Sequence, residues 1–268
     1  MASLGVGGFL VVLVLSLVFG VDLFSVLGVA SPLGGQTSTG FAPPGQRADD
    51  GEKVAFVSAV LDDTQAMWAA MFRESGLPYE EAQLVLDDGS VASACGTVPE
   101  AAGPFYCPLD GTIYLSFSFY DTLRDRYGAS GDFAEAYVIA HEMGHHVQNL
   151  LGTAAEVRER QQAQPAQANR LSVALELQAD CYAGVWGGEQ MRAVEAQAAD
   201  NVESITLDDF QDAIAAAAAI GDDALQRQAR GRVNPETFTH GTSEQRVDWF
   251  TRGFESGDPT ACDTFAAP

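Results

Sequence analysis

The chain has 268 residues, of which 47% are hydrophobic, and its formal net charge at pH 7 is -23. This apolar content is enough for a sizeable core and excludes a disordered or fibrous chain. A surface this acidic repels phosphate backbones, so nucleic acid is not expected as a partner.

The first 30 residues have the composition of a membrane segment. Residues 1–21 carry no charged side chain, and the stretch Phe9–Phe19 is strongly apolar. With residues 21–30 it is long enough to cross a bilayer, which takes about 20 residues. A cleaved signal peptide is the alternative, because residues 28–30 have a small-x-small pattern. We expect an uncleaved, single-pass anchor over residues 1–30, which places the remainder outside the cytoplasm.

Residues 31–52 are rich in Gly, Pro, Ser and Thr and offer almost nothing to bury. This composition is typical of a flexible linker. We therefore expect one folded domain over residues 53–268.

Within this domain the apolar pattern is mainly helical. Apolar residues between Val54 and Phe72 recur at roughly helical spacing and predict a first helix. Short strands are expected at 83–86 and 112–115, and further helices at 132–151, 167–186, 207–220 and 243–255. The helix at 167–186 is expected to stop at Gly187-Gly188, because glycine commonly follows a helix end. The fold class is therefore α+β, mostly helical with a small sheet, preceded by one N-terminal transmembrane helix.

The four cysteines form no CxxC pair, so a structural zinc knuckle is not expected. Several pairings are open. A bond between Cys95 and Cys107 would close a short loop rich in Gly and Pro. A bond between Cys181 and Cys262 would then tie the C-terminal tail to the middle of the chain. Four buried free thiols are the alternative if the protein is cytosolic.

The motif HEMGH at residues 141–145 lies in the expected helix 132–151. Residues four apart share one face of a helix, so His141 and His145 can present two imidazole nitrogens to one zinc ion. Glu142 is placed to reach a water molecule on that ion. His146 points elsewhere on the helix and is interpreted as a structural histidine.

A catalytic zinc usually takes three protein ligands and leaves a fourth position open. The metzincin pattern would need Gly and His where this chain has Gln148 and Leu151. His240 is possible but lies far along the chain. The strongest candidate is Glu176, which precedes Asp180 by four residues on an expected helix. One of these carboxylates can bind zinc while the other accepts the free N–H of a ligand histidine.

Five separated segments resemble the bacterial family of putative neutral zinc metallopeptidases. They are Gly103–Asp110, His141–Gln148, Glu176–Gly184, His240–Phe250 and Gly257–Asp263. The likeness covers nearly everything after the linker, while the N-terminus is shorter and less basic than is usual in that family.

The resemblance implies a zincin-like metallopeptidase domain anchored by one N-terminal membrane segment. By analogy with gluzincins, Glu176 is the third metal ligand and Asp180 orients His141. The resemblance further implies that His240 donates to the oxyanion of the reaction intermediate, with Arg246 helping to stabilise the charge. A loop histidine with no catalytic part is the alternative for His240.

These features predict a zinc-dependent endopeptidase with Zn²⁺ as cofactor, Glu142 as general base and a peptide or protein as substrate. By analogy, the strand at 112–115 would bind an extended substrate as an added strand. A non-catalytic, zinc-containing, membrane-anchored binding or assembly protein is the alternative, and the presence of Glu142 counts against it. A DNA-associated HExxH protease is disfavoured by the acidic charge and the apolar N-terminus.

Overall fold

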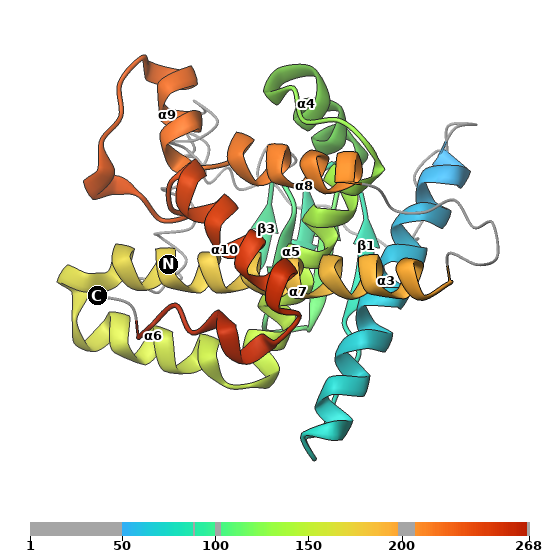
Figure 1. Ribbon diagram of the computed structural model, residues 1–268. Coiled ribbons are helices and arrows are strands. Elements are labelled where there is room, and N and C mark those ends of the chain that lie inside the picture. Colours follow the sequence, from blue (N-terminus) through green and yellow to red (C-terminus); the bar gives the residue numbers. More distant parts are fainter. Residues whose placement is uncertain (1–49, 88, 100–102, 198–206, 267–268) are drawn as a thin grey trace, which may run out of the picture.

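The computed structural model describes residues 50–87, 89–99, 103–197 and 207–266 (Figure 1). The expected anchor at residues 1–30 and nearly all of the expected linker lie outside these ranges. Within the described part of the chain, no helix combines the length and the apolar character that crossing a membrane requires.

The secondary structure is mainly helical with short strands, which confirms the α+β expectation. The helices are α3 (Asp50–Glu74), α4 (Phe117–Tyr127), α5 (Asp132–Leu150), α6 (Thr153–Ala163), α7 (Ala168–Gln197), α8 (Leu207–Ala219), α9 (Asp222–Arg230) and α10 (Ser243–Ser256). The strands are β1 (Gln83–Leu86), β2 (Val91–Ser93), β3 (Gly96–Val98), β4 (Phe105–Cys107) and β5 (Thr112–Leu115). Short 3-10 turns are η2 (Pro165–Gln167), η4 (Pro235–Thr237) and η5 (Pro259–Cys262).

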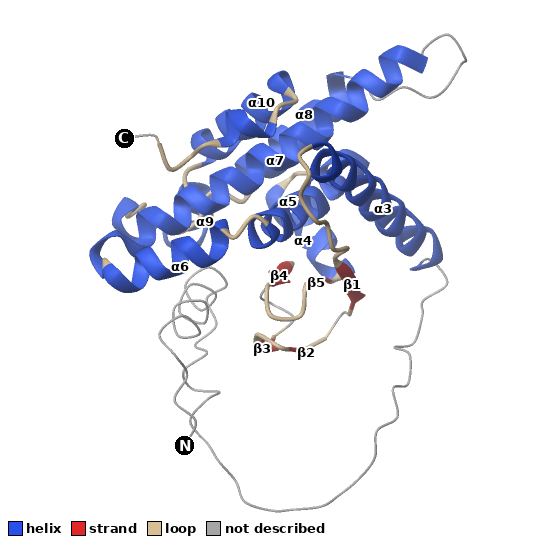
Figure 2. Ribbon diagram, turned by 90° about the horizontal axis from the view of Figure 1, so that it is seen from below, coloured by secondary structure: helices blue, strands red, loops and turns tan. Residues whose placement is uncertain are grey.

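The strands lie on one side of the helices, and α5 lies between them and α7 (Figure 2). Helix α10 packs on α7, and α3 and α8 contact α5. Most of the residues of α5 are buried, from Phe133 to Gln148. A helix that is buried nearly all round is a central core element. The HEMGH motif therefore lies on the most enclosed helix of the domain.

The larger sheet has the strand order β1-β5-β4, with β5 parallel to β1 and antiparallel to β4. All four residues of β5 are buried. The expectation that the strand at 112–115 could bind a substrate by adding a strand is therefore wrong. Both of its edges are already paired within the sheet.

The hairpin of β2 and β3 is tied to the larger sheet by a disulfide between Cys95 and Cys107. Asp110 supports the same junction, because its Oδ2 accepts the backbone N–H of Ala94 at 2.9 Å and the hydroxyl of Tyr114 at 2.9 Å. The short loop between these cysteines is thus closed by a covalent bond and by a carboxylate.

Helix α7 does not stop at Gly187-Gly188 as expected but continues to Gln197. Gly188 and Gly184, one turn before it, serve the crossing with α10. A Cβ at Gly184 would lie 2.0 Å from the carbonyl oxygen of Phe250, and one at Gly188 would lie 2.3 Å from that of Phe254. Close approach of two backbones requires residues without side chains, so glycine here marks helix packing and not a helix end.

A second disulfide, between Cys181 and Cys262, joins α7 to η5 just after α10. The two strands and the other helices expected from the sequence are present with nearly the expected bounds. The short helices α4, α6 and α9 and the strands β2, β3 and β4 were not predicted.

Candidate metal centre

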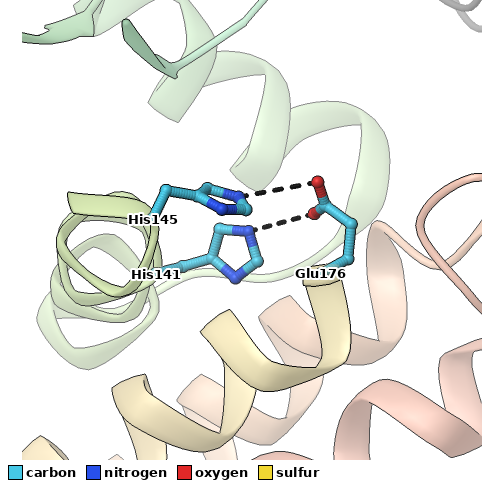
Figure 3. Close-up of side chains that lie close together, drawn as sticks. All are labelled: His141, His145 and Glu176. Atoms are coloured by element: carbon cyan, nitrogen blue, oxygen red, sulfur yellow. Dashed lines mark hydrogen bonds and ion pairs between the residues drawn. The ribbon is translucent and has the colours of Figure 1, made fainter. Parts of the chain in front are cut away.

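His141 and His145 lie one turn apart on α5 and face Glu176 on α7 (Figure 3). The Nε2 atom of His141 is 3.2 Å from Oε2 of Glu176, and Nε2 of His145 is 3.5 Å from Oε1. One ligand atom from each of the three residues lies within 4.8 Å of the others. The spacing predicted for the two histidines and the carboxylate is thus realised in three dimensions.

The glycine of the HEMGH motif allows the two helices to meet at this point. A Cβ at Gly144 would lie 2.9 Å from both the Cα and the carbonyl oxygen of Ala179 on α7. A larger residue would push α7 away from α5. Glu176, one turn before Ala179, would then move out of reach of the histidines.

The second nitrogen of His141 is bound by Asp180, as expected. Its Nδ1 lies 2.8 Å from Oδ1 of Asp180, a residue with no exposed surface. Burial lowers the pKa of the His141 imidazole, but the charge of Asp180 and the hydrogen bonds that the ring donates to Asp180 and Glu176 raise it to about 9. The bond to Nδ1 turns Nε2 toward Glu176.

His145 has an equivalent support that was not predicted. Its Nδ1 lies 2.9 Å from the side-chain oxygen of Gln148, one turn further along α5. Burial lowers the pKa of His145, while the charge of Glu176 and its hydrogen bond outweigh burial and raise the pKa. Both imidazoles therefore direct Nε2 at the same carboxylate.

Glu176 completes the cluster. Burial would raise the pKa of its carboxyl group, but the nearby charges of His145 and His240 and the hydrogen bonds from His141 and His145 hold the pKa well below its ordinary value. The carboxylate and the two imidazoles thus form a site that attracts positive charge. A metal ion would displace the protons on binding.

These residues fit a zinc ion. Two imidazole nitrogens and one carboxylate oxygen are a common ligand set of catalytic zinc, which keeps a further position open. The side chains of His145 and Glu176 remain 18% and 19% exposed, against 8% for His141. The accessible side of the cluster is therefore at His145 and Glu176.

Glu142, next to His141 on α5, is only 7% exposed, and its Oε2 has no hydrogen-bond partner in the described part of the chain. Burial raises the pKa of this carboxyl group, while the charges of His145 and His141 oppose the rise. A buried carboxylate oxygen without a partner is energetically costly, so a functional role is the expected reason for it. Here it lies beside three metal-ligand candidates.

His240 lies in the loop between α9 and α10, with its side chain 33% exposed. The carboxylate of Asp222 holds this loop. It accepts the backbone N–H groups of Thr239, His240 and Gly241 and lies 3.3 Å from Nδ1 of His240. Burial lowers the pKa of His240, but the charge of Glu176 and the hydrogen bond to Asp222 raise it above its ordinary value. His240 is therefore close enough to the cluster to interact with it electrostatically.

Arg246 lies elsewhere than expected. Its guanidinium is buried and binds Asp180, with Nη2 also donating to the hydroxyl of Tyr137 at 3.1 Å. It approaches the Nδ1 side of His141, whereas Glu176 lies on the Nε2 side. The expected contact of Arg246 with the reacting carbonyl is therefore not supported, because its donors are engaged on the Nδ1 side of His141.

His146 is a structural histidine, as expected. Its Nδ1 is 3.0 Å from the hydroxyl of Tyr106, and its Nε2 donates to the carbonyl oxygen of Glu80 at 2.7 Å. Both ring nitrogens have partners away from the cluster.

The model of the family described as "Putative neutral zinc metallopeptidase" matches residues 1–265. The chain belongs to this family. It is 46% identical over 265 residues to protein YpfJ of Escherichia coli (strain K12), covering 97% of this chain and 87% of the relative. It is also 46% identical over 214 residues to Rv2575 of Mycobacterium tuberculosis (strain ATCC 25618 / H37Rv), covering 79% of this chain and 70% of that protein. Both relatives are named as uncharacterized. No solved structure matches significantly.

In this member of the zinc metallopeptidase family, sequence reasoning missed Gln148, Tyr137 and Asp222. Gln148 could have been found, because it lies three residues after His145 on a predicted helix and so neighbours it. Tyr137 precedes His141 by four residues and carries the same signal. Asp222 could not have been found, since it reaches His240 from a different element.

Proposed function

We propose that this chain is a zinc-dependent endopeptidase that hydrolyses peptide bonds. The proposal is carried by one observation: three potential ligand atoms lie within 4.8 Å of one another, beside a buried carboxylate oxygen of Glu142 that has no hydrogen-bond partner among the described residues. The family to which the chain belongs supports the same reaction class.

In this proposal His141, His145 and Glu176 hold the zinc ion. Zinc bound by these donors would supply Lewis acidity, which activates water and polarises a carbonyl group. Asp180 and Gln148 hold the two imidazoles by Nδ1 and leave Nε2 available for the metal. This arrangement presets the ligands before a metal arrives.

Glu142 is the proposed general base. Its raised pKa, caused mainly by burial, makes the carboxylate a stronger base than an exposed glutamate. It would accept the proton of the attacking water and deliver that proton to the leaving amine.

His240 is the proposed donor to the oxygen of the scissile carbonyl. Because Nδ1 is engaged by Asp222, its Nε2 is the nitrogen left to face a substrate. With Nδ1–H donating to Asp222, Nε2 carries a proton in the imidazolium form, and the neighbouring charge of Asp222 favours that form. A donor aimed at developing negative charge stabilises the transition state.

We further propose that the domain lies outside the cytoplasm on a single N-terminal anchor at residues 1–30. The pairing of all four cysteines supports an oxidising compartment, where disulfides persist. The net charge of -23 disfavours nucleic acid as a partner, because both would be negatively charged. The proposed substrate is a peptide or protein.

The deciding experiment compares the purified protein with its Glu142→Gln variant for bound zinc and for cleavage of an unstructured protein such as casein. The parent should contain zinc and lose activity with a chelator, and added zinc should restore it. The variant should keep zinc and lose about 100- to 10,000-fold in activity. Zinc binding without any hydrolysis by the parent would instead favour the binding or assembly protein.

A further inference from the structure

Gln148 occupies an unusual position for a neutral polar side chain. It has no exposed surface, and it lies on α5 between His145 and helix α7. Its oxygen is 2.9 Å from Nδ1 of His145. Its nitrogen is 2.7 Å from the carbonyl oxygen of Leu175 and 3.2 Å from the side-chain oxygen of Gln178. All of its polar atoms are therefore engaged.

The direction of each hydrogen bond in this chain follows from two backbone carbonyl groups, which can only accept. The nitrogen of Gln148 must face the carbonyl oxygen of Leu175. The nitrogen of Gln178 must likewise face the carbonyl oxygen of Cys262, 3.0 Å away, so its oxygen faces Gln148. Turning either amide around would set two acceptors against each other. Both amides are thus fixed in one orientation.

This orientation determines the state of the histidine. With its nitrogen committed to Leu175, Gln148 offers only an oxygen to His145, and that oxygen needs a donor. Nδ1 of His145 must then carry a proton, which leaves the lone pair of the neutral ring on Nε2. Nε2 is the atom that faces Glu176.

We infer that Gln148 is a positioning residue that holds His145 in the Nδ1–H tautomer and so presents Nε2 to the metal. The inference rests on the zinc site proposed above and adds to it a residue outside the ligand set. Gln148 touches neither substrate nor metal in this proposal and acts through the imidazole.

The two ligand histidines are therefore supported by different chemistry. His141 is held by the carboxylate of Asp180, whose charge is balanced by Arg246. His145 is held by a neutral amide, which adds no charge to a buried site. An ionised carboxylate at position 148 would set a negatively charged oxygen against the carbonyl oxygen of Leu175. A buried charge of that kind is costly.

The support also reaches the C-terminal part of the chain. Gln178 links Gln148 to the carbonyl oxygen of Cys262, and the same cysteine is bonded to Cys181 on α7. The orientation of His145 on α5 thus depends on Cys262, which lies 84 positions after Gln178 in the sequence.

The first test needs no variant. In the zinc-loaded full-length protein, nitrogen NMR of the histidine rings should show His145 with a proton on Nδ1 that exchanges slowly with solvent, and with the metal on Nε2. Metal on Nδ1, or a proton on Nε2, would overturn the inference whatever the stability of any mutant.

The second test measures zinc affinity by competition with a chelator. Gln148→Met keeps the volume but removes the acceptor, and it should weaken zinc binding by about 10- to 100-fold. Gln148→Glu, in its protonated form, can still accept from Nδ1 and donate to Leu175, so it should retain the tautomer and bind zinc more tightly than Gln148→Met. This rescue separates positioning from packing.

Gln161→Met is the matched control. Gln161 also bridges two helices, donating to the carbonyl oxygen of Ala168 at 3.1 Å and to the hydroxyl of Ser172 at 2.9 Å, and it touches no histidine. Its loss should leave zinc affinity unchanged.

The outcomes distinguish the inference from the function on which it depends. A parent protein that fails to bind zinc overturns both. Tight zinc binding that persists in Gln148→Met overturns the inference alone and leaves the proposed peptidase standing. If Gln148→Met does not fold, the inference is tested by the NMR result on the parent protein and by the Gln148→Glu variant. Loss of the Nδ1–H tautomer of His145 in Gln148→Glu would also contradict the inference.

Discussion

Arg246 on α10 donates hydrogen bonds to both carboxylate oxygens of Asp180 on α7. Its Nε is 2.9 Å from Oδ2, and its Nη2 is 2.9 Å from Oδ1. Asp180 has no exposed surface, and its Oδ1 also accepts from the hydroxyl of Tyr137 at 2.5 Å. Burial would raise the pKa of the Asp180 carboxyl group, but the charges of Arg246 and His141 hold the pKa below its ordinary value. The anion that orients His141 is thus kept ionised by a cation from a third helix.

We predict that Arg246→Met destabilises the metal-free protein by about 3–5 kcal/mol, because it leaves a buried carboxylate without its cation. Zinc affinity should fall by about 10- to 100-fold, since Asp180 would no longer be fixed behind His141. Urea unfolding and chelator competition measure the two effects. As a control, Arg227→Met removes an exposed guanidinium that pairs with Asp223 and should cost about 0–1 kcal/mol. Equal costs for the two variants would contradict the prediction.

The site contains contacts that the sequence predicts and one, between Asp180 and Arg246, that it does not. The pairs His141–His145 and Glu176–Asp180 could be predicted, because spacing by four places side chains on one face of a helix. The contact between Asp180 and Arg246 spans 66 positions and depends on how α10 crosses α7. No local pattern encodes that crossing, so the sequence did not predict this contact. The family resemblance instead implied that Arg246 faces the substrate.

The glycines of α7 likewise have a role that depends on helix packing and not on local sequence. Glycine both ends helices and permits close packing, and local sequence does not distinguish these uses. At Gly187-Gly188 we expected a helix end, and the deciding fact is that the backbone of α10 lies against Gly188. The bounds of the strands at 83–86 and 112–115 were predictable, but the central place of the second was not.

We predict that Gly184→Ala destabilises the domain by at least about 3 kcal/mol, because its Cβ would lie 2.0 Å from the carbonyl oxygen of Phe250. Gly187→Ala is the matched control one turn away. Its Cβ would meet side-chain atoms at 3.4 Å or more, which is ordinary contact. That variant should be neutral or more stable by up to about 1 kcal/mol, since alanine favours a helix over glycine. Thermal unfolding that does not separate the two variants would refute the packing argument.

We predict that Asp222→Asn destabilises the metal-free protein by about 1–3 kcal/mol near neutral pH, because asparagine cannot replace all the hydrogen bonds to the loop at His240. Burial would raise the pKa of the Asp222 carboxyl group, but the hydrogen bonds and charge of His240 lower it overall. A lowered folded pKa means that the carboxylate stabilises the fold above its unfolded pKa, and that this stabilisation is lost as pH falls through the folded pKa.

The stability difference between the parent and Asp222→Asn should therefore be largest at about pH 7 and should shrink toward about pH 3. Urea unfolding across this range measures it. Asp62→Asn is the control, because Asp62 is an exposed residue of α3 whose loss should cost little at any pH. A difference that stays constant with pH would contradict the assignment of Asp222. Peptide hydrolysis by Asp222→Asn should also fall, with kcat more affected than KM, because His240 loses its orientation.

Glu176→Gln tests the third ligand directly. The substitution keeps the shape of the side chain but removes the charge that attracts the metal, so zinc affinity should fall by more than about 100-fold, beyond the loss expected for an outer partner. In the metal-free variant the pKa of His145 should drop, because the charge of Glu176 is the main cause that raises it against burial. Histidine NMR titration and chelator competition measure the two effects separately. Glu156→Gln makes the same change of charge on α6 at an exposed side chain and should alter neither. Unchanged zinc affinity in Glu176→Gln would remove Glu176 from the ligand set. A lowered pKa of His145 in that variant would still show that Glu176 and His145 are neighbours in solution.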